Sequence, residues 1–321
     1  MVGFGNISNR HRKNLRKLFP SAIIYGMSSS GRNPATNPEN CDEVVESISQ
    51  MIALLPDFVI VASPANFHAI HSMPLIEAGI PVLIEKPVCA TLFQASELAD
   101  AVRSHHGKVS IAYCLRYLAS TTFMKNAVEN ELVGKIYNIQ IDTGQYLPDW
   151  RPTADYRKTV SANQNLGGGV LLELSHDIDY LIWIFGSFTV QKSILRSVAE
   201  LETDVEDIAD VMLSNDHGLV ASLHLDFLQR APKRQCVVIG TRGTLIWDLI
   251  QNEVWFDTNE GRQVLYDGSQ EDRNNMYLQM LMDFADFAKS GTEPPICIDE
   301  AIETLRLVER IKNSSEVEIV K

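Results

Sequence analysis

The first third of the chain alternates short apolar runs with helix-like segments, and this alternation restricts the fold more than any other feature. The apolar runs that read as strands are Ser21–Tyr25, Phe58–Ala62, Pro81–Ile84 and Val109–Tyr113. Segments with helical periodicity, such as residues 92–102, lie between them. Strands that lack polar alternation and are separated by helices predict a parallel sheet covered on both faces. This is the doubly wound α/β pattern of a Rossmann domain.

The rest of the chain predicts a different kind of domain, because longer strands follow one another with only turns between them. The expected strands are residues 136–146, 208–214, 219–228, 235–240 and 244–249. Strands joined by turns form antiparallel sheets, so we expect an α+β domain with a large, mostly antiparallel open sheet.

The predicted domains are residues 1–118, which would bind a dinucleotide, and residues 119–321, which would bind the substrate and a second subunit. The second domain has one strong predicted helix, at residues 170–185. A last helix, at residues 299–312, could pack on either domain.

Composition limits the classes of partner and compartment. The 321 residues carry a net charge of −13, which argues against nucleic acid as the main partner because no surplus of Lys and Arg offsets the phosphates. The five cysteines are scattered without ligand spacing, which predicts reduced thiols and no metal site. No apolar run reaches the ~18 residues that span a membrane. The first residues lack the form of a signal peptide, so we expect a cytoplasmic protein without a membrane partner.

Residues 3–8, Gly-Phe-Gly-Asn-Ile-Ser, have the form Gly-x-Gly-x-x-Ser and open a basic helix. In a dinucleotide fingerprint the first Gly makes the tight turn, and the second lets the backbone approach the pyrophosphate. The third small residue packs the helix on the strand. The phosphates then lie on free N–H groups at the helix N-terminus. We expect Gly3, Gly5, Asn6 and Ile7 to contact a dinucleotide.

Two features of this region leave alternatives open. Only Met1 and Val2 precede the first glycine, so either the start codon is placed too late, which we favour, or the domain has a stub first strand. The basic residues from His11 to Lys17 form either a solvated helix face, which is the more common situation, or a local basic patch for nucleic acid.

The loop after the second strand decides the cofactor. An Asp or Glu about 20 residues beyond the glycines would bind the ribose hydroxyls of NAD and repel a 2′-phosphate. The loop at residues 26–32 instead offers Ser28, Ser29 and Arg32, which can hold a phosphate. We therefore expect NADP in preference to NAD. The alternative is a polar loop whose Arg32 faces water.

Two further loops follow predicted strands, at the edge of the sheet where ligands gather in open α/β folds. The first loop carries Ser63, Pro64, Asn66 and His68. The second is Glu85-Lys86-Pro87, in which Lys86 lies between a buried strand and a stiff residue. Lys86 could donate a proton or a hydrogen bond to a substrate hydroxyl during hydride transfer. The alternative is a surface turn in which Glu85 and Lys86 form a pair.

The predicted helix at residues 170–185 has a polar face made of Glu173, His176, Asp177 and Tyr180. Glu173 and His176 are three residues apart and so are neighbours on the helix surface. A carboxylate beside an imidazole orients it, as a general acid/base near neutral pH requires. We expect Glu173 and His176 to be catalytic and Tyr180 to contact substrate. The alternative is that His176 is an ordinary surface histidine.

Aromatic and charged residues interleave in the segment before this helix. Trp150 and Tyr156 offer ring faces to the C–H surface of a sugar, and Arg151 and Arg157 suit hydroxyls, a carboxylate or a phosphate. This pattern predicts a carbohydrate-like substrate. The alternative is a rigid loop that joins the domains.

The chain resembles the Gfo/Idh/MocA oxidoreductases, named for glucose–fructose oxidoreductase and inositol dehydrogenase. The motifs that carry the resemblance are Gly3-x-Gly5, Ser63-Pro64 with Asn66 and His68, Glu85-Lys86-Pro87, Arg116, Gly134-Lys135-Ile136, Gly167-Gly168-Gly169 and His176. They span nearly the whole chain. The resemblance implies that Lys86 contacts nicotinamide and substrate, and that His176 transfers a proton. It also places with the cofactor the residues of the loops after the predicted strands and one residue beyond them: Ser63, Pro64, Asn66, His68, Glu85 and Arg116.

One motif departs from the family pattern, which is usually Asp-x-x-x-His after the glycines. This chain has Glu173-Leu174-Ser175-His176, one residue shorter. His176 keeps the role of the histidine, and Asp179 matches an acidic position of the family. The missing residue rotates Glu173 on the helix, so the sequence leaves open whether Glu173 replaces the aspartate.

These features together predict reversible hydride transfer between a nicotinamide and a hydroxyl-bearing carbon of a sugar, sugar acid or nucleotide sugar. His176 would be the acid/base, and Lys86 would polarise the oxygen. One alternative is a glycosidase or lyase that keeps NAD(P) tightly bound and acts by transient oxidation. The other is a non-catalytic regulator that senses dinucleotide.

The sheet of the second domain also predicts self-association. One of its faces lacks a covering helix in this prediction. Leu223, Leu225 and Phe227 are expected to form an apolar patch there that a second subunit covers. We therefore expect a homodimer or homotetramer.

Overall fold

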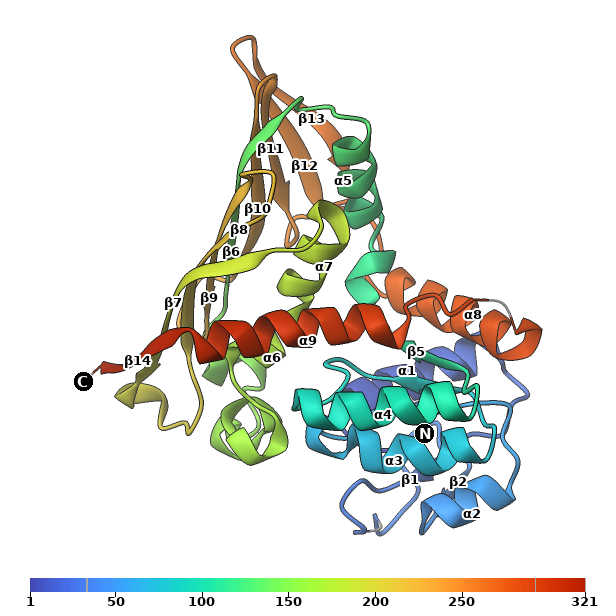
Figure 1. Cartoon of the computed structure of the whole chain (residues 1–321). Helices are drawn as coiled ribbons and strands as arrows, with labels where there is room; N and C mark the ends of the chain where they lie inside the picture. Colours follow the sequence, from blue (N-terminus) through green and yellow to red (C-terminus); the bar gives the residue numbers. More distant parts are fainter. Residues whose placement is uncertain (33, 292, 321) are drawn as a thin grey trace. The chain divides into compact units, whose positions relative to one another are not determined.

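The computed structural model describes residues 1–32, 34–291 and 293–320 (Figure 1). The chain forms two compact units. The first contains Met1–Cys114 and Arg273–Leu305, and the second contains Leu115–Asp272 and the described residues from Arg306 on. The sequence predicts a single boundary after residue 118. In the structure, residues 273–305 return to the first unit, which includes the first half of the last helix.

The first unit is built on short parallel strands. These are β1 (Tyr25–Met27), which pairs with β2 (Glu43–Val45), and the series β3 (Val59–Val61), β4 (Val82–Ile84) and β5 (Val109–Ile111). Val2 joins the two groups, because it bridges Met27 on one side and Val61 on the other. The resulting order, β2-β1-Val2-β3-β4-β5, is the strand order of a doubly wound Rossmann sheet. The predicted fold class is confirmed.

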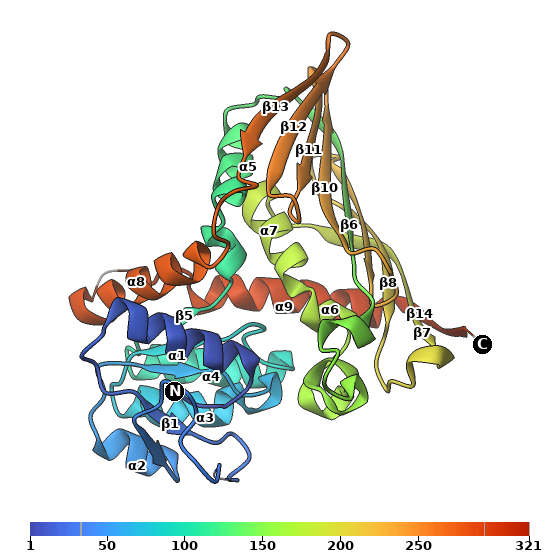
Figure 2. The ribbon, with the colours of Figure 1, turned by 180° about the vertical axis from the view of Figure 1, so that it is seen from behind.

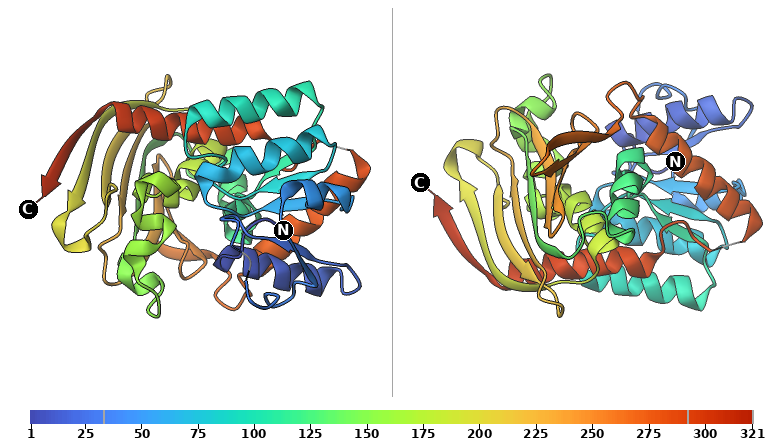
Figure 3. Two further views of the ribbon diagram at one scale, coloured as in Figure 1. Left: turned by 90° about the horizontal axis from the view of Figure 1, so that it is seen from below. Right: turned by 90° about the horizontal axis from the view of Figure 1, so that it is seen from above.

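Helices lie on both faces of this sheet (Figure 3). They are α1 (Asn6–Leu18), α2 (Ile48–Ala53), α3 (His68–Glu77), α4 (Leu92–Ser104) and α8 (Asn275–Ser290). α3 packs on α4, and α1 packs on α8. Every residue of β3, β4 and β5 is buried, as a parallel sheet between two helix layers requires.

Two details of this unit differ from the prediction. The strand expected at Ser21–Tyr25 begins only at Tyr25, because the N–H groups before it bond elsewhere. That of Ala22 donates to the Phe19 carbonyl in a turn, and that of Ile24 donates to the Asp42 carboxylate. Helix α8 has no counterpart among the predicted elements.

The second unit contains a nine-stranded sheet. Its strands are β6 (Ile136–Gly144), β7 (Thr189–Val198), β8 (Ile208–Ser214), β9 (Val220–Asp226), β10 (Lys233–Gly240), β11 (Gly243–Asp248), β12 (Glu253–Thr258), β13 (Gly261–Asp267) and β14 (Ser315–Val320). Their order is β13-β12-β11-β10-β6-β9-β8-β7-β14. β6 pairs with β9, and β7 with β14, in parallel, and the other pairs are antiparallel. The predicted large, mostly antiparallel sheet is confirmed.

Helices α5 (Ala119–Glu129), α6 (Val170–Glu173) and α7 (Ser175–Phe185) lie against one face of this sheet (Figure 2). α9 (Ile298–Asn313) begins in the first unit and ends in the second. The unbroken helix predicted at residues 170–185 is wrong, because Leu174, with φ −95° and ψ 20°, separates α6 from α7. The domain also has α5 as a second long helix, where the sequence predicts only one.

The opposite face of the sheet is open: no helix within the described ranges covers it (Figure 1). The predicted apolar patch on this face is wrong, because Leu223, Leu225 and Phe227 are at most 2% exposed and belong to the covered face. His224, between the two leucines, instead points to the open face with 41% of its side chain exposed. Strand alternation identifies which residues share a face, but not which face a helix covers.

Candidate dinucleotide site and acid–base groups

Gly3 lies so close to the end of β3 that no other residue fits there. Its φ is +103°, and a Cβ at this position would lie 2.4 Å from the carbonyl oxygen of Ala62. The Gly3 N–H donates to the Met27 carbonyl, and the Ala62 N–H donates to the Val2 carbonyl, both at 2.8 Å. The glycine turn is therefore anchored between the ends of β1 and β3.

The N-terminus of α1 presents backbone N–H groups that suit an anion. No side chain among the described residues caps it, and a Cβ on its N-cap residue, Gly5, would meet nothing within 4 Å. Ser8 is fully buried, and its hydroxyl donates to the Gly3 carbonyl at 2.6 Å. Residues 3–8 therefore fit a pyrophosphate, with open backbone at the positive end of a helix dipole.

The basic residues of α1 form the solvated face that the sequence favours only in part: Lys13 and Lys17 are exposed and Arg16 is half-buried, whereas two others are interior. His11 is 0% exposed and Arg12 is 2% exposed. The Arg12 guanidinium donates to the Ser8 hydroxyl and to the Glu39 carbonyl, each at 2.9 Å. The buried residues Ser8, His11, Arg12 and Leu15 follow the helical period, but three of these four are polar, so no apolar stripe in the sequence indicates that this face is interior.

The loop after β1 provides hydroxyls and one exposed cation. The Ser30 N–H donates to the Ser28 hydroxyl at 3.3 Å, so Ser28, which is buried, supports the loop from inside. Ser29 is half-buried and Arg32 is exposed. Both side chains are therefore accessible from solvent, and residues 26–32 contain no carboxylate that would repel a phosphate.

The loop after β3 is tied to the loop after β4 by a buried histidine. His68 is 1% exposed. Its Nε2 lies 2.8 Å from the Ser63 carbonyl oxygen, and its Nδ1 lies 2.9 Å from the Pro87 carbonyl oxygen. Burial lowers the pKa of His68, while the hydrogen bonds to these carbonyl groups oppose that shift. His68 therefore supports these loops from inside, while Pro64 and Asn66 remain partly exposed.

Glu85 and Lys86 follow β4 directly. The Glu85 N–H donates to the Val61 carbonyl at 2.9 Å, which continues the pairing of β3 with β4. The Glu85 carboxylate is buried: Oε1 lies 2.6 Å from His11 Nε2, and Oε2 accepts from the Lys86 N–H at 3.2 Å. Lys86 is half-buried. A surface turn with both side chains in water does not describe this pair, because Glu85 is only 7% exposed.

In the second unit, two buried aspartates hold α7. Asp177 is fully buried and accepts from Arg234 Nη2 at 2.8 Å and from the Thr143 hydroxyl at 3.0 Å. Asp179 accepts from both Arg116 Nη2, at 2.7 Å, and Arg116 Nε, at 3.0 Å. The Arg116 side chain, predicted to bind cofactor, is 7% exposed and serves this ion pair. Sequence reasoning missed both pairs, since their partners are 57 and 63 residues apart.

The polar face predicted for residues 170–185 is only partly correct. Asp177 and Tyr180 are fully buried, and the Tyr180 ring packs edge-to-face on Trp247 with centroids 5.0 Å apart. Burial raises the pKa of the Tyr180 hydroxyl well above its usual value. Glu173 and His176 are half-buried. They come from the end of α6 and the first turn of α7, so the break at Leu174 lies between them.

The aromatic segment before α6, residues 145–157, is fixed by contacts with other residues of the second unit. The Trp150 indole N–H donates to the Gln145 carbonyl at 3.2 Å, and its ring packs on Phe227. Arg157 donates to Asp155 at 2.9 Å and to Glu202 at 2.6 Å. Tyr156 is half-buried and Arg151 is exposed. Among the predicted substrate arginines, Arg151 has the more accessible guanidinium, because Arg157 is already paired with two carboxylates.

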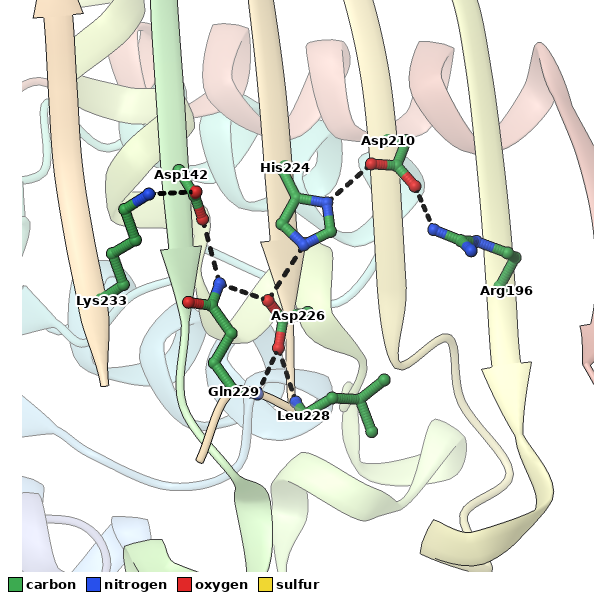
Figure 4. Close-up of polar contacts among 8 residues, drawn as sticks. All are labelled: Asp142, Arg196, Asp210, His224, Asp226, Leu228, Gln229 and Lys233. Atoms are coloured by element: carbon green, nitrogen blue, oxygen red, sulfur yellow. Dashed lines mark hydrogen bonds and ion pairs between the residues drawn. The ribbon is translucent and has the colours of Figure 1, made fainter. Parts of the chain in front are cut away.

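The open face of the sheet carries a charged network that the sequence analysis did not identify (Figure 4). His224 bonds through Nδ1 to Asp210 at 2.7 Å and through Nε2 to Asp226 at 3.1 Å. Asp142, His224 and Asp226 have ligand atoms within 4.8 Å of one another. However, the Gln229 amide donates to Asp142 at 3.0 Å and to Asp226 at 2.7 Å, so protein donors already satisfy these oxygens.

None of the described helices is both long and apolar enough to cross a membrane.

The glycine turn, the open N-terminus of α1 and the Lys86 loop, all on one Rossmann sheet, are typical of the class of dinucleotide-binding proteins. Residues 1–113 match the model of an oxidoreductase family with an NAD-binding Rossmann fold, and residues 121–246 match the GFO/IDH/MocA C-terminal domain. The two models together match more than half of the chain. The chain therefore belongs to the Gfo/Idh/MocA oxidoreductases.

Named relatives act on sugars and cyclitols. The D-glucoside 3-dehydrogenase of Escherichia coli (strain K12) is 31% identical over 153 residues, which cover 46% of this chain and 40% of that protein. The myo-inositol 2-dehydrogenase of Thermotoga maritima is 25% identical over an alignment of 333 residues, which covers 98% of this chain and 95% of that protein. The first similarity thus spans less than half of the relative.

Solved structures share the fold over the whole chain. A 3-ketoreductase from Actinomadura kijaniata, in complex with NADP and TDP-benzene, has a TM-score of 0.85 at 17% identity and covers 100% of this chain and 98% of its own. The WlbA dehydrogenase from Bordetella pertussis, in complex with NADH and UDP-GlcNAcA, has a TM-score of 0.79 at 20% identity and covers 98% and 93%. Both similarities concern the fold alone.

Proposed function

We propose that this oxidoreductase transfers a hydride between NADP and a hydroxyl-bearing carbon of a sugar, sugar acid or nucleotide sugar. The observation that carries the proposal is the convergence of three loops at the carboxyl ends of adjacent strands in the first unit. Val2 is bonded to Ala62, and Val61 to Glu85, so the glycine turn, Ser63 and Lys86 follow three neighbouring strands. Ligands of open α/β sheets bind at this edge.

Residues of the first unit fit the cofactor. The first-turn N–H groups of α1 would bind the pyrophosphate, with Gly5 leaving room for it. Ser29 and Arg32 would bind a 2′-phosphate, which supports NADP over NAD. When bound, the nicotinamide supplies the hydride donor or acceptor.

Lys86 and His176 would carry the proton and charge changes of the reaction. A half-buried lysine held beside a buried carboxylate donates a hydrogen bond to the substrate oxygen and stabilises negative charge on it. His176 is half-buried at the start of α7. It takes the hydroxyl proton in oxidation and returns it in reduction. Glu173 is a supporting candidate, and Arg151, Trp150 and Tyr156 are candidates for substrate contact.

A substrate panel tests the proposal. Purified protein is mixed with NADP or NAD and with methyl D-glucosides, D-glucose 6-phosphate, myo-inositol or UDP-N-acetylglucosamine, and absorbance of the reduced nicotinamide is followed. We expect net reduction with at least one compound, faster with NADP. A changed sugar without net reduction would instead identify a glycosidase or lyase. Dinucleotide binding without any turnover would favour a regulator.

We further propose that the open sheet face binds a second copy of the chain. Val237, Ile246 and Trp255 are cross-strand neighbours on β10, β11 and β12, and all three are partly exposed. Met212, on the same face, is 52% exposed. Partly exposed apolar side chains beside paired charges suit an isologous interface. Light scattering at micromolar concentration should show a dimer or tetramer, and Ile246→Asp should dissociate it; a wild-type monomer would refute this proposal.

A further inference from the structure

A buried histidine on the pyrophosphate-binding helix bonds to the residue before Lys86. His11 is 0% exposed, and its Nε2 lies 2.6 Å from Glu85 Oε1. A carboxylate only accepts hydrogen bonds, so Nε2 must carry the proton in this contact. Among the described residues, none bonds to His11 Nδ1. Within the residues that the structure describes, the bond to Glu85 is therefore the one hydrogen bond of the His11 ring.

Glu85 connects His11 to Lys86, because its carboxylate bonds to both residues. Its Oε2 accepts from the Lys86 N–H at 3.2 Å, and its own N–H is bonded to Val61 in β3. Both the backbone and the side chain of Glu85 are thus fixed. On the other side of Lys86, the Pro87 carbonyl lies 2.9 Å from His68 Nδ1. The lysine therefore stands between two anchored residues.

The His11 contact matters because Glu85 is buried. A carboxylate that is 7% exposed and loses one of its donors cannot replace it fully with water. The carboxylate must then turn toward another donor, and this change disturbs the hydrogen bond to the Lys86 N–H. Replacing His11 by an apolar residue would therefore change the position of Lys86 indirectly, through Glu85.

We propose that His11 is a positioning residue, which holds Lys86 in place through Glu85 and links it to the helix whose N-terminus binds the dinucleotide. The inference rests on the proposed function for the importance of Lys86. It extends that function by naming a residue that need not contact either ligand.

Four variants test the proposal in the full-length protein. His11→Leu removes the donor, and His11→Asn keeps an amide but shortens the side chain. His11→Gln can place its amide nitrogen close to the position of Nε2 and restore the bond. Asn14→Leu is the matched control, because Asn14 is buried on the same helix but bonds to Asn274 instead of Glu85.

The first readout is the chemical reactivity of the Lys86 amine, which needs no substrate. Competitive acetylation followed by peptide mass spectrometry compares Lys86 with Lys158, whose side chain is 83% exposed. In His11→Leu and His11→Asn we expect the relative rate at Lys86 to change by about threefold or more, the effect of one net hydrogen bond. His11→Gln and Asn14→Leu should match the wild type. An unchanged rate in folded His11→Leu and His11→Asn, or equal changes in all three His11 variants, would overturn the proposal.

The second readout separates this inference from the proposed function. With a substrate found in the panel, His11→Leu should lower kcat by about 10- to 100-fold while KM and the NADPH dissociation constant change little. His11→Gln should recover most of kcat. If Lys86→Met leaves hydride transfer intact, the proposed role of Lys86 fails, but the acetylation result still decides whether His11 positions it.

Discussion

Gly3 and Ala62 are in such close contact that a Cβ on Gly3 would lie 2.4 Å from the Ala62 carbonyl oxygen. Gly5, two residues later in the same motif, has no atom within 4 Å of its own missing Cβ. The two glycines therefore serve different needs. The first is required by the packing of the protein on itself, and the second leaves space for a ligand.

This difference predicts opposite results for two alanine variants. Gly5 has φ −72°, which alanine adopts freely, so Gly5→Ala should unfold at the wild-type temperature. The same variant should bind NADPH about tenfold or more weakly, because its methyl group occupies the space through which the backbone contacts the pyrophosphate. Gly3→Ala should lower the free energy of unfolding by ~1–3 kcal/mol from backbone strain, and the clash with Ala62 should add to this loss. Thermal unfolding and fluorescence titration measure both. Wild-type affinity in Gly5→Ala would contradict the assignment of the pyrophosphate site.

Arg32 should select the phosphorylated cofactor. Replacing this exposed guanidinium by a carboxylate, in Arg32→Glu, removes a charge-assisted contact worth about 1.5–3 kcal/mol and adds repulsion. The NADPH dissociation constant should therefore rise by about tenfold or more, while that of NADH changes little. Lys158→Glu, in the second unit, controls for the change in net charge. Equal effects of Arg32→Glu on both dinucleotides would reject the predicted preference for NADP.

The buried pair of Arg116 and Asp179 predicts a loss of stability instead of a loss of cofactor affinity. Arg116→Met leaves a carboxylate that is 1% exposed without this partner, which should cost about 3–5 kcal/mol in the free energy of unfolding. Arg116→Met with Asp179→Leu should recover part of that loss. Urea unfolding gives both values. A stable Arg116→Met variant with weakened NADPH binding would instead support the cofactor role that the family resemblance implies.

The sequence identified β3 to β6 and β8 to β11, because uninterrupted apolar runs and turn-linked strands follow from local chemistry. It did not identify β2, β7, β12, β13 or β14. It was less reliable where a distant partner decides the structure. The turn before Tyr25 depends on Asp42, and the burial of Asp177 depends on Arg234. No local pattern reports such contacts, so the sequence places Asp177 on a polar helix face and does not show that this side chain is buried.

The sequence also does not show which face of each strand the helices cover. Leu223 and Leu225 share a face by alternation, but only the positions of α5, α6 and α7 show that this face is the inner one. In the predicted site, the loops carrying Gly3, Ser63 and Lys86 could be expected together, because they end parallel strands of one sheet. His11 was not expected there, since a basic residue in the first helix usually faces water.

The stability of the second unit should depend on pH through His224. Hydrogen bonding to Asp226, opposed by burial and reinforced by Asp210, raises the pKa of His224 from 6.5 to about 9. A pKa raised in the folded state contributes stability that is complete below the unfolded value of 6.5 and is lost as pH rises through about 9. The difference in the free energy of unfolding between wild type and His224→Gln should therefore shrink from pH 6 to pH ~10. A difference that does not vary with pH would disprove this coupling.

Transfer of an isotopic label tests the central claim most directly. NADPH carrying deuterium at the nicotinamide C4 is incubated with the protein and the keto form of the sugar found in the panel, and the product is examined by mass spectrometry and NMR. We expect deuterium on one carbon of the product, with the rate strongly reduced in Lys86→Met and in His176→Asn. Product without deuterium from the cofactor, or undiminished transfer in both variants, would contradict the account.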